Sequence, residues 1–436
     1  MSSSMYIEFI SVTLLIAVIW PLLLSIPPLH RRLPWPRHLA IIPAAVLAVI
    51  PIDVSFNIPW LLYGTGFAID GNIRWILGAF VVIWFVAATI SLPTKEKSSP
   101  DYATTLFLLT FTGSLGVLLT ADLVGFFSFS TLMGYGFYGL LIQDGNKALL
   151  KIGRHYLYVL IVADIALFEA LLLVAFTTEN FQYEMVRQTM SEISSSPIYL
   201  YMVLIGFVLK AAIWPFYFWL TAAFNSGSRS IALLLIAGPI TMSLLGLLRW
   251  MPARDDIYIL GFVMQFIGAA AILHSVLKIL TSGMFKQGTR RFNTAWLVIT
   301  FTGLFSLALG AALQDQNLWQ QFSYLIYPAI SIFSLLVSLL ILSSFKTHNE
   351  TVLIDNTPVL IKNIFHRLKE WLCSTQQLAS AIKLTSLTLW IKLGSFIMKQ
   401  YQHVSSDHKI RAFVPDWKIN ITLFLILVLA ITWLAV

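Results

Sequence analysis

A lysine in the middle of an apolar stretch is the residue of this sequence that is best placed to do chemistry. Residues 197–223 are almost continuously hydrophobic, and Lys210 stands near their centre. An ammonium group in hydrocarbon costs about 3 kcal/mol on insertion scales, so it persists only with a partner or beside a water-filled path. Pro215 removes a backbone donor five residues later, which predicts a break in the helix. We interpret the lysine and the break as parts of an ion path. A lysine that reaches an interface beside a structural kink is the alternative.

Two carboxylates in the preceding apolar stretch could pair with this lysine. Asp164 and Glu169 lie within residues 152–176, and His155 lies near one end of that stretch. Acids and lysine cannot all remain unpaired in lipid, so we expect a pairing between the two helices. The two acids are about 140° apart around a helix, so only one of them should face Lys210. Such a pair could handle protons, and a static ion pair would account for the same residues.

The elements that position these residues must be membrane helices. The sequence is 58% hydrophobic and 11% charged, which excludes a soluble globular chain. Its fourteen Trp and fifteen Tyr suit two membrane–water boundaries.

Cys373 is the one cysteine of the sequence, which excludes an internal disulfide and a cysteine metal cluster. Metal-binding and phosphate-binding motifs are absent from the sequence, so we expect no cofactor, no metal and no catalytic centre within this chain.

The apolar runs predict an all-α polytopic membrane protein with about twelve transmembrane helices. Most runs approach the roughly 20 residues that cross about 30 Å of hydrocarbon. They lie at residues 5–27, 39–53, 73–93, 102–121, 123–142, 152–176, 197–223, 230–250, 256–276, 292–313, 321–344 and 418–436. The first run has no basic region before it and no small-residue cleavage site, so we expect a retained span.

Basic residues predict how the chain is oriented. Lysines and arginines gather in alternate connections, at residues 31–37, 95–97, 147–154, 229, 278–291 and 345–416. The opposite connections are richer in acidic residues. The positive-inside rule therefore places the basic set in the cytoplasm and both termini outside the bacterial inner membrane. This topology accounts for the net charge of +8, so we expect the lipid bilayer and no nucleic acid as a partner.

These features resemble a family, the antiporter-like membrane subunits of respiratory complex I, Mrp-type cation/proton antiporters, membrane-bound hydrogenases and inorganic-carbon uptake complexes. Residues 204–220, LIGFVLKAAIWPFYFWL, resemble the broken seventh helix of that family, with Lys210 at its lysine and Pro215 at its break. Ala163 and Asp164 resemble the Gly-Asp of the sixth helix in the larger, subunit-five-like members. Further similarities lie at Asp70, Ala295 and Gly303.

The sequence also departs from the pattern that it resembles. The fifth-helix glutamate of the family corresponds to Thr131, and the eighth-helix lysine or histidine corresponds to Thr241. The second broken helix and its charged residue are missing. The resemblance therefore implies a first half-channel around Lys210, in which Asp164 or Glu169 replaces the missing glutamate. Asp164 is the better candidate, because the larger members also keep an acid there.

The resemblance divides the chain into five regions. N-terminal transmembrane helices at 1–100 precede a first antiporter-like repeat with the broken helix at 101–250 and a truncated second repeat at 251–345. A cytoplasmic amphipathic segment at 346–416 and a C-terminal transmembrane helix at 417–436 follow. The amphipathic segment could brace a neighbouring subunit or hold the ends of this chain together.

The resulting hypothesis is a proton- or cation-translocating or coupling subunit, which works with other membrane or peripheral subunits in a hetero-oligomeric complex. One alternative is the membrane subunit of an inorganic-carbon uptake complex coupled to proton influx. The other is a structural scaffold that conducts nothing. A conductor needs polar continuity from Lys210 to both membrane faces, whereas a scaffold needs none.

The asymmetry of basic residues makes the topology testable. Reporter domains fused within residues 94–101 and 345–416 should be active in the cytoplasm, and one fused within 177–196 should be active outside. An external reporter at 345–416 would show that the number of spans is wrong.

Overall fold

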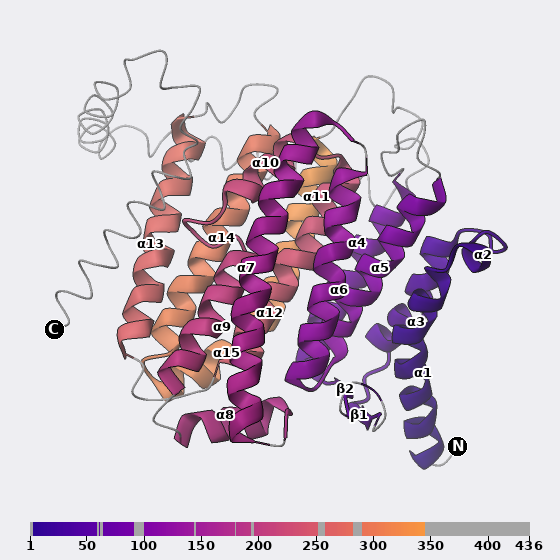
Figure 1. Cartoon of the computed structure of the whole chain (residues 1–436), viewed down its shortest axis with the longest axis horizontal. Helices are drawn as coiled ribbons and strands as arrows, with labels where there is room; N and C mark the ends of the chain where they lie inside the picture. Colours follow the sequence, from indigo (N-terminus) through magenta and orange to yellow (C-terminus); the bar gives the residue numbers. More distant parts are fainter. Residues whose placement is uncertain are drawn as a thin grey trace. The chain divides into compact units, whose positions relative to one another are not determined.

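The computed structural model describes residues 3–58, 61, 64–90, 100–143, 145–178, 180–192, 196–251, 258–281 and 290–344. These residues form a bundle of helices (Figure 1). In chain order the helices are α1 Ser3–Leu24, α2 Pro27–His30, α3 Pro36–Val49, α4 Gly71–Thr89, α5 Pro100–Leu119, α6 Leu123–Ile142, α7 Lys147–Thr177, α8 Tyr183–Glu192, α9 Ser196–Lys210, α10 Phe218–Ser226, α11 Arg229–Leu235, the π-helical turn η1 Ile236–Ile240, α12 Thr241–Trp250, α13 Tyr258–Thr281, α14 Arg290–Ala312 and α15 Gln316–Ser344. Strands β1 Val54–Asn57 and β2 Gly66–Ile69 pair as an antiparallel hairpin, with Val54 opposite Ile69.

The expected class, an all-α polytopic membrane protein, is confirmed. Eight of the described helices are long and apolar enough to cross a membrane, at Gly71–Thr89, Asp101–Leu119, Leu123–Ile142, Lys147–Thr177, Arg229–Trp250, Ile259–Ile279, Thr294–Ala312 and Asn317–Ser343. Three shorter apolar helices cover Ile10–Leu24, Pro36–Val49 and Ile198–Lys210. Each apolar run predicted between residues 5 and 344 therefore lies mainly within helices. The predicted span at 418–436 and the amphipathic segment at 346–416 lie outside the described residues, so the count of twelve stays a prediction.

Glycines let α13 and α14 approach each other closely. A Cβ on Gly268 would lie 2.5 Å from the carbonyl oxygen of Gly303, and one on Gly310 would lie 2.5 Å from that of Gly261. Within each helix the two glycines are seven residues apart, so they recur on one face. Small residues at such a face are the usual means of close helix packing in membranes.

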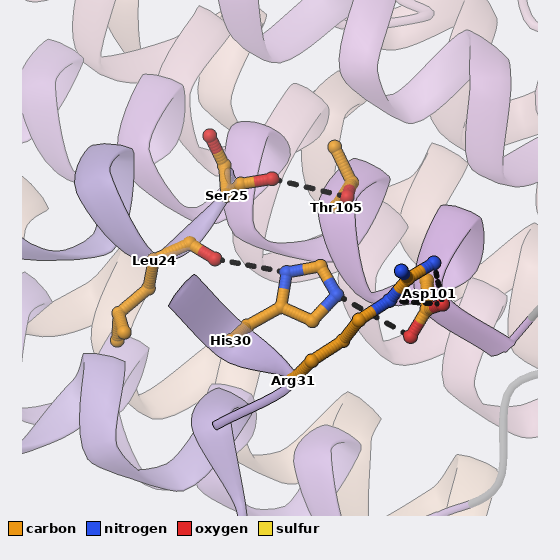
Figure 2. Close-up of polar contacts among 6 residues, drawn as sticks. All are labelled: Leu24, Ser25, His30, Arg31, Asp101 and Thr105. Atoms are coloured by element: carbon orange, nitrogen blue, oxygen red, sulfur yellow. Dashed lines mark hydrogen bonds and ion pairs between the residues drawn. The ribbon is translucent and has the colours of Figure 1, made fainter. Parts of the chain in front are cut away.

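Asp101, in the first turn of α5, ties the N-terminal helices to the bundle (Figure 2). Its carboxylate accepts a hydrogen bond from Arg31 Nε at 2.8 Å and lies 3.6 Å from Nε2 of the buried His30. The other ring nitrogen of His30, Nδ1, lies 3.1 Å from the carbonyl oxygen of Leu24. A further bond of 3.1 Å runs from the Thr105 hydroxyl to the Ser25 carbonyl. The carboxylate also lies at the positive end of the α5 dipole, where negative charge is stabilised.

A buried guanidinium joins α12 to the end of α5. Arg249 is 5% exposed and donates hydrogen bonds to the carbonyl oxygens of Val117 and Leu118, each at 2.7 Å, and of Thr120 at 3.2 Å. The last carbonyls of a helix have no partner within the helix, and the helix dipole makes this end negative. Arg249 therefore supplies both the hydrogen bonds and the charge that the end of α5 requires. Its guanidinium also lies 5.3 Å from the centre of the Tyr183 ring.

Asp122 fastens the β-hairpin to the start of α6. Its Oδ1 caps the helix by accepting the backbone N–H of Gly125 at 2.7 Å, and its Oδ2 accepts that of Gly66 at 2.9 Å. Burial raises the pKa of Asp122, and these two hydrogen bonds oppose that rise. Burial likewise raises the pKa of Tyr183, on α8, to about 12, although the positive charge of Arg249 acts in the opposite direction.

Arg249→Met should lower the thermal stability of the purified protein by at least about 2 kcal/mol, because each buried carbonyl that loses its donor costs about 1–3 kcal/mol. Size-exclusion chromatography after heating in detergent measures the loss. Arg154→Met is the control, since the Arg154 side chain is exposed on α7. Equal melting temperatures for the two variants would contradict this role of Arg249.

Candidate functional site

The seventh apolar run is broken, as expected from Pro215. Helix α9 ends at Lys210, the next seven residues are not helical, and α10 begins at Phe218. Ala212, in the break, has a φ of 52°, a left-handed conformation that is rare for a residue with a Cβ and is often found at functional sites. The backbone N–H of Ala211 donates to Phe207 at 2.8 Å, so the break begins with a satisfied donor. Irregular backbone at membrane depth requires such internal partners.

Lys210, at the edge of this break, is held by two other helices. Its ammonium nitrogen lies 2.6 Å from Oδ1 of Asp164 on α7 and donates a hydrogen bond of 2.8 Å to the hydroxyl of Ser130 on α6. Lys210 is 5% exposed, Asp164 8% and Ser130 2%. The ammonium is therefore removed from solvent and meets one charged and one neutral oxygen.

A glycine permits this contact between α7 and α9. A Cβ on Gly206, one turn before Lys210, would lie 2.5 Å from the Leu167 side chain and 3.2 Å from the carbonyl oxygen of Ala163. Ala163 directly precedes Asp164 in the sequence. The missing side chain thus lets the two helices touch at the level of the ion pair.

A small cavity of about 10 Å³ adjoins Lys210, which is room for roughly one water molecule. Helices α6, α7, α9, α12 and the turn η1 surround it, through Ser130, Met133, Gly134, Tyr156, Val159, Leu160, Lys210, Pro239 and Ser243. Three buried oxygens of the residues considered above accept no hydrogen bond from a described residue: both carboxylate oxygens of Asp164, of which Oδ1 is ion-paired with Lys210, and Oγ1 of Thr131. The neighbourhood of the ammonium thus combines a void with unused hydrogen-bonding capacity.

The turn η1 makes the span α11–α12 irregular where that span lines the cavity. Pro239 lies inside the π-helical turn and cannot donate a backbone hydrogen bond. Thr241, the residue expected at the eighth-helix position, donates its hydroxyl to the carbonyl of Ile236 at 2.7 Å. Its hydrogen bond therefore stays within its own helix.

The structure does not bring the other candidate residues to the ammonium. Glu169 is exposed on α7 and forms no ion pair with a described residue. His155 lies nine residues before Asp164, about 13 Å along the helix axis, and its ring contacts the ring of Phe218 at 6.3 Å between centres. Ser130 contacts Lys210 in place of Thr131. The sequence offered one signal for it, a second hydroxyl next to the expected position.

A second polar cluster lies at the other edge of the break. The hydroxyl oxygen of Tyr217, the last residue before α10, is 2.8 Å from Nε2 of His274 on α13. The ring of Trp296, on α14, lies 5.2 Å from that of Tyr217 and 5.3 Å from that of His274, between ring centres. No sequence pattern indicated that these three residues meet.

Comparisons with known proteins match the part of the chain that contains this site. Residues 120–287, which include Lys210, Asp164, Ser130 and the break, match the family described as NADH:quinone oxidoreductase/Mrp antiporter, transmembrane. Over these residues the chain is similar to the antiporter-like membrane subunits. This confirms the family that the sequence resembles.

Two curated relatives show how much of such a protein is shared. The chain is 30% identical over 138 residues to a probable K(+)/H(+) antiporter component of Rhizobium meliloti, covering 29% of this chain and 24% of that protein. It is 28% identical over 156 residues to a Na(+)/H(+) antiporter component of Staphylococcus aureus, covering 34% and 19%. The matched part of this chain thus spans a quarter or less of the length of these relatives.

Solved structures show a similar fold over more of the chain. The Mrp complex from Dietzia sp. DQ12-45-1b contains a chain that matches with a TM-score of 0.59 at 18% identity, over 76% of this chain and 36% of the other. The membrane-bound sulfane sulfur reductase, an archaeal respiratory membrane complex, contains one that matches with a TM-score of 0.57 at 14% identity, over 78% and 86%.

The ion pair predicts a strong coupling between its two residues. Asp164→Asn leaves a buried ammonium without its counter-charge, and Lys210→Met leaves a buried carboxylate. Each change should lower stability by about 3–5 kcal/mol. The double variant should be little worse than either single variant, because the interaction can be lost only once. The melting temperatures of the wild type, the two single variants and the double variant, all purified in detergent, measure this coupling as a double-mutant cycle.

Glu169→Gln serves as the matched control on the same helix and should change the melting temperature little, since Glu169 is exposed. Losses that add in the double variant would mean that Asp164 and Lys210 do not stabilise each other.

Proposed function

We propose that the chain is an ion-translocating subunit of a multi-subunit complex in the bacterial inner membrane, and that protons or cations pass Lys210. The observation that carries the proposal is the buried Lys210–Asp164 contact of 2.6 Å at the edge of a broken membrane helix. Intramembrane ionisable residues mark ion pathways and proton relays by default. A break in the same span gives the backbone freedom to change that contact.

The pair can exist in two arrangements. With Asp164 close, its negative charge stabilises the ammonium, and the proton stays on Lys210. When the carboxylate moves away or takes up a proton, the ammonium loses its counter-charge and its proton is released more easily. Oδ2 of Asp164 accepts no hydrogen bond from a described residue, so it has a lone pair for an incoming proton.

Ser130 extends this site toward the cavity. Its oxygen accepts the hydrogen bond of Lys210, and its own O–H can donate to another acceptor at the same time. One water molecule in the adjoining cavity would provide such an acceptor. Lys210, Ser130 and this water together would form the first steps of a hydrogen-bonded path.

The ion pair alone provides no energy for transport, which is why the proposal places the chain in a complex. The relatives in Rhizobium meliloti and Staphylococcus aureus are named as antiporter subunits, and the similar folds belong to an Mrp complex and a respiratory membrane complex. Partner subunits would supply either a second ion gradient or a redox reaction. The basic connections would face the cytoplasm, as the positive-inside rule requires.

Lys210→Met should abolish ion-coupled transport by the complex while the protein stays in the membrane. Lys210→Arg should restore little, because a guanidinium scarcely gives up its proton. Everted membrane vesicles from cells with the complete complex are energised, and the change of acridine orange fluorescence on addition of NaCl or KCl measures the transport.

Lys151→Met, at an exposed position near the start of α7, is the control and should keep wild-type transport. Wild-type transport by Lys210→Met would favour a scaffold that conducts nothing.

A further inference from the structure

The helix break carries hydrogen-bonding side chains at both of its edges. Lys210 is the last residue of α9 and contacts α6 and α7. Tyr217 is the last residue before α10 and contacts His274 on α13. The segment between them therefore links a polar site in the first part of the bundle to one in the second part.

The contact between Tyr217 and His274 is enclosed by aromatic rings. Trp296 is 4% exposed and packs against both rings, with centres 5.2 and 5.3 Å away. His274 itself is half-buried, and Tyr217 is 5% exposed. A hydrogen bond of 2.8 Å in such surroundings holds the imidazole in one orientation, with Nε2 directed at the break.

Lys210 and His274 both lie far along their helices. Lys210 is fourteen residues after the start of α9, about 21 Å along the axis, and His274 is sixteen residues after the start of α13, about 24 Å. The span formed by α11–α12 follows α9 and precedes α13 in the sequence and runs in the opposite direction, so α9 and α13 run in the same direction (Figure 1). His274 is thus five residues from the end of the candidate span Ile259–Ile279, about 8 Å along the axis.

His274 is the ionisable residue of the second part of the bundle that touches the break. Lys278 follows one turn later on α13, and α10 and residues 294–312 of α14 contain no ionisable side chain. On the neighbouring helices, His155 of α7 reaches the Phe218 ring and Arg229 begins α11. These groups are the charged and titratable surroundings of His274 among the described residues.

We propose that His274 is a second proton-binding residue of the ion path and that the Tyr217 hydroxyl connects it to the helix break. This rests on the function proposed above. In the neutral imidazole with its hydrogen on Nδ1, Nε2 accepts the O–H of Tyr217. Addition of one proton at Nε2 reverses the hydrogen bond, so that Nε2–H donates to the tyrosine oxygen. The O–H of Tyr217 then turns to another acceptor, a water molecule or a carbonyl oxygen. Loss of that proton restores the first state.

His274→Gln and Tyr217→Phe test this role in everted vesicles that contain the complete complex. The glutamine amide can still bond to Tyr217, but it does not titrate. Both variants should lower NaCl- or KCl-dependent transport at least tenfold per amount of this protein in the membrane. The rate of His274→Gln should also lose the part of its pH dependence that lies between about pH 5 and 8, where histidine titrates.

Thr300→Val is the matched control. It removes the 2.8 Å hydrogen bond between Thr300 and Ser275, which joins α13 to α14 one residue after His274, and it should keep wild-type transport and pH dependence. An unchanged pH profile or rate for His274→Gln, together with inactive Lys210→Met, would overturn the role of His274 alone. Active Lys210→Met would overturn the proposed function itself. Transport rates are divided by the amount of this protein in the membrane, and the shape of the pH profile does not depend on that amount. A variant that is present at a low level therefore still tests the proposal.

Discussion

The positive charge of Lys210 in the bundle interior is the constraint on which the surrounding structure depends. A buried ion is tolerated only when its partners are close and its remaining hydrogen-bonding groups are satisfied. Asp164 supplies the counter-charge at 2.6 Å and Ser130 supplies a neutral oxygen at 2.8 Å. Both distances require three helices to meet, and Gly206 removes the side chain that would hold two of them apart. The glycine at position 206 is therefore explained by the burial of the Lys210 charge, which requires the helices to lie close together.

The helical irregularities gather around the same point. Pro215 lies in the break after α9, and Pro239 lies in the π-helical turn before α12. Lys210, the last helical residue before the break, and Pro239 both line the small cavity, so each irregular segment begins at or includes a residue of its wall. A membrane helix without its regular hydrogen bonds is costly in lipid, and it is tolerated in the interior of a protein or beside a cavity. The placement of both prolines is consistent with a site that exchanges hydrogen bonds during its work.

Features that depend on local sequence could be predicted, and those that depend on helix rotation could not. Hydropathy located the helices because a span needs a continuous apolar run, and Pro215 located the break because the ring prevents a helical hydrogen bond. Which hydroxyl of α6 contacts Lys210 could be learned only from the tertiary structure. Ser130 and Thr131 differ by about 100° around the helix, and nothing in the sequence determines which of them faces α9. Tyr217 and His274 are 57 residues apart, so their contact depends entirely on how α13 packs against the break.

This last contact changes how the second part of the bundle is understood. Judged by the pattern that the sequence resembles, that part lacks the second broken helix and its charged residue. The geometry places an imidazole at the break instead, through a side chain that the break itself carries. A histidine needs only a small change of surroundings to gain or lose a proton near neutral pH. In the proposed path, the seven-residue break has an ammonium at one edge and a phenol–imidazole pair at the other. A shift of that segment would alter both hydrogen bonds together, without a second broken helix.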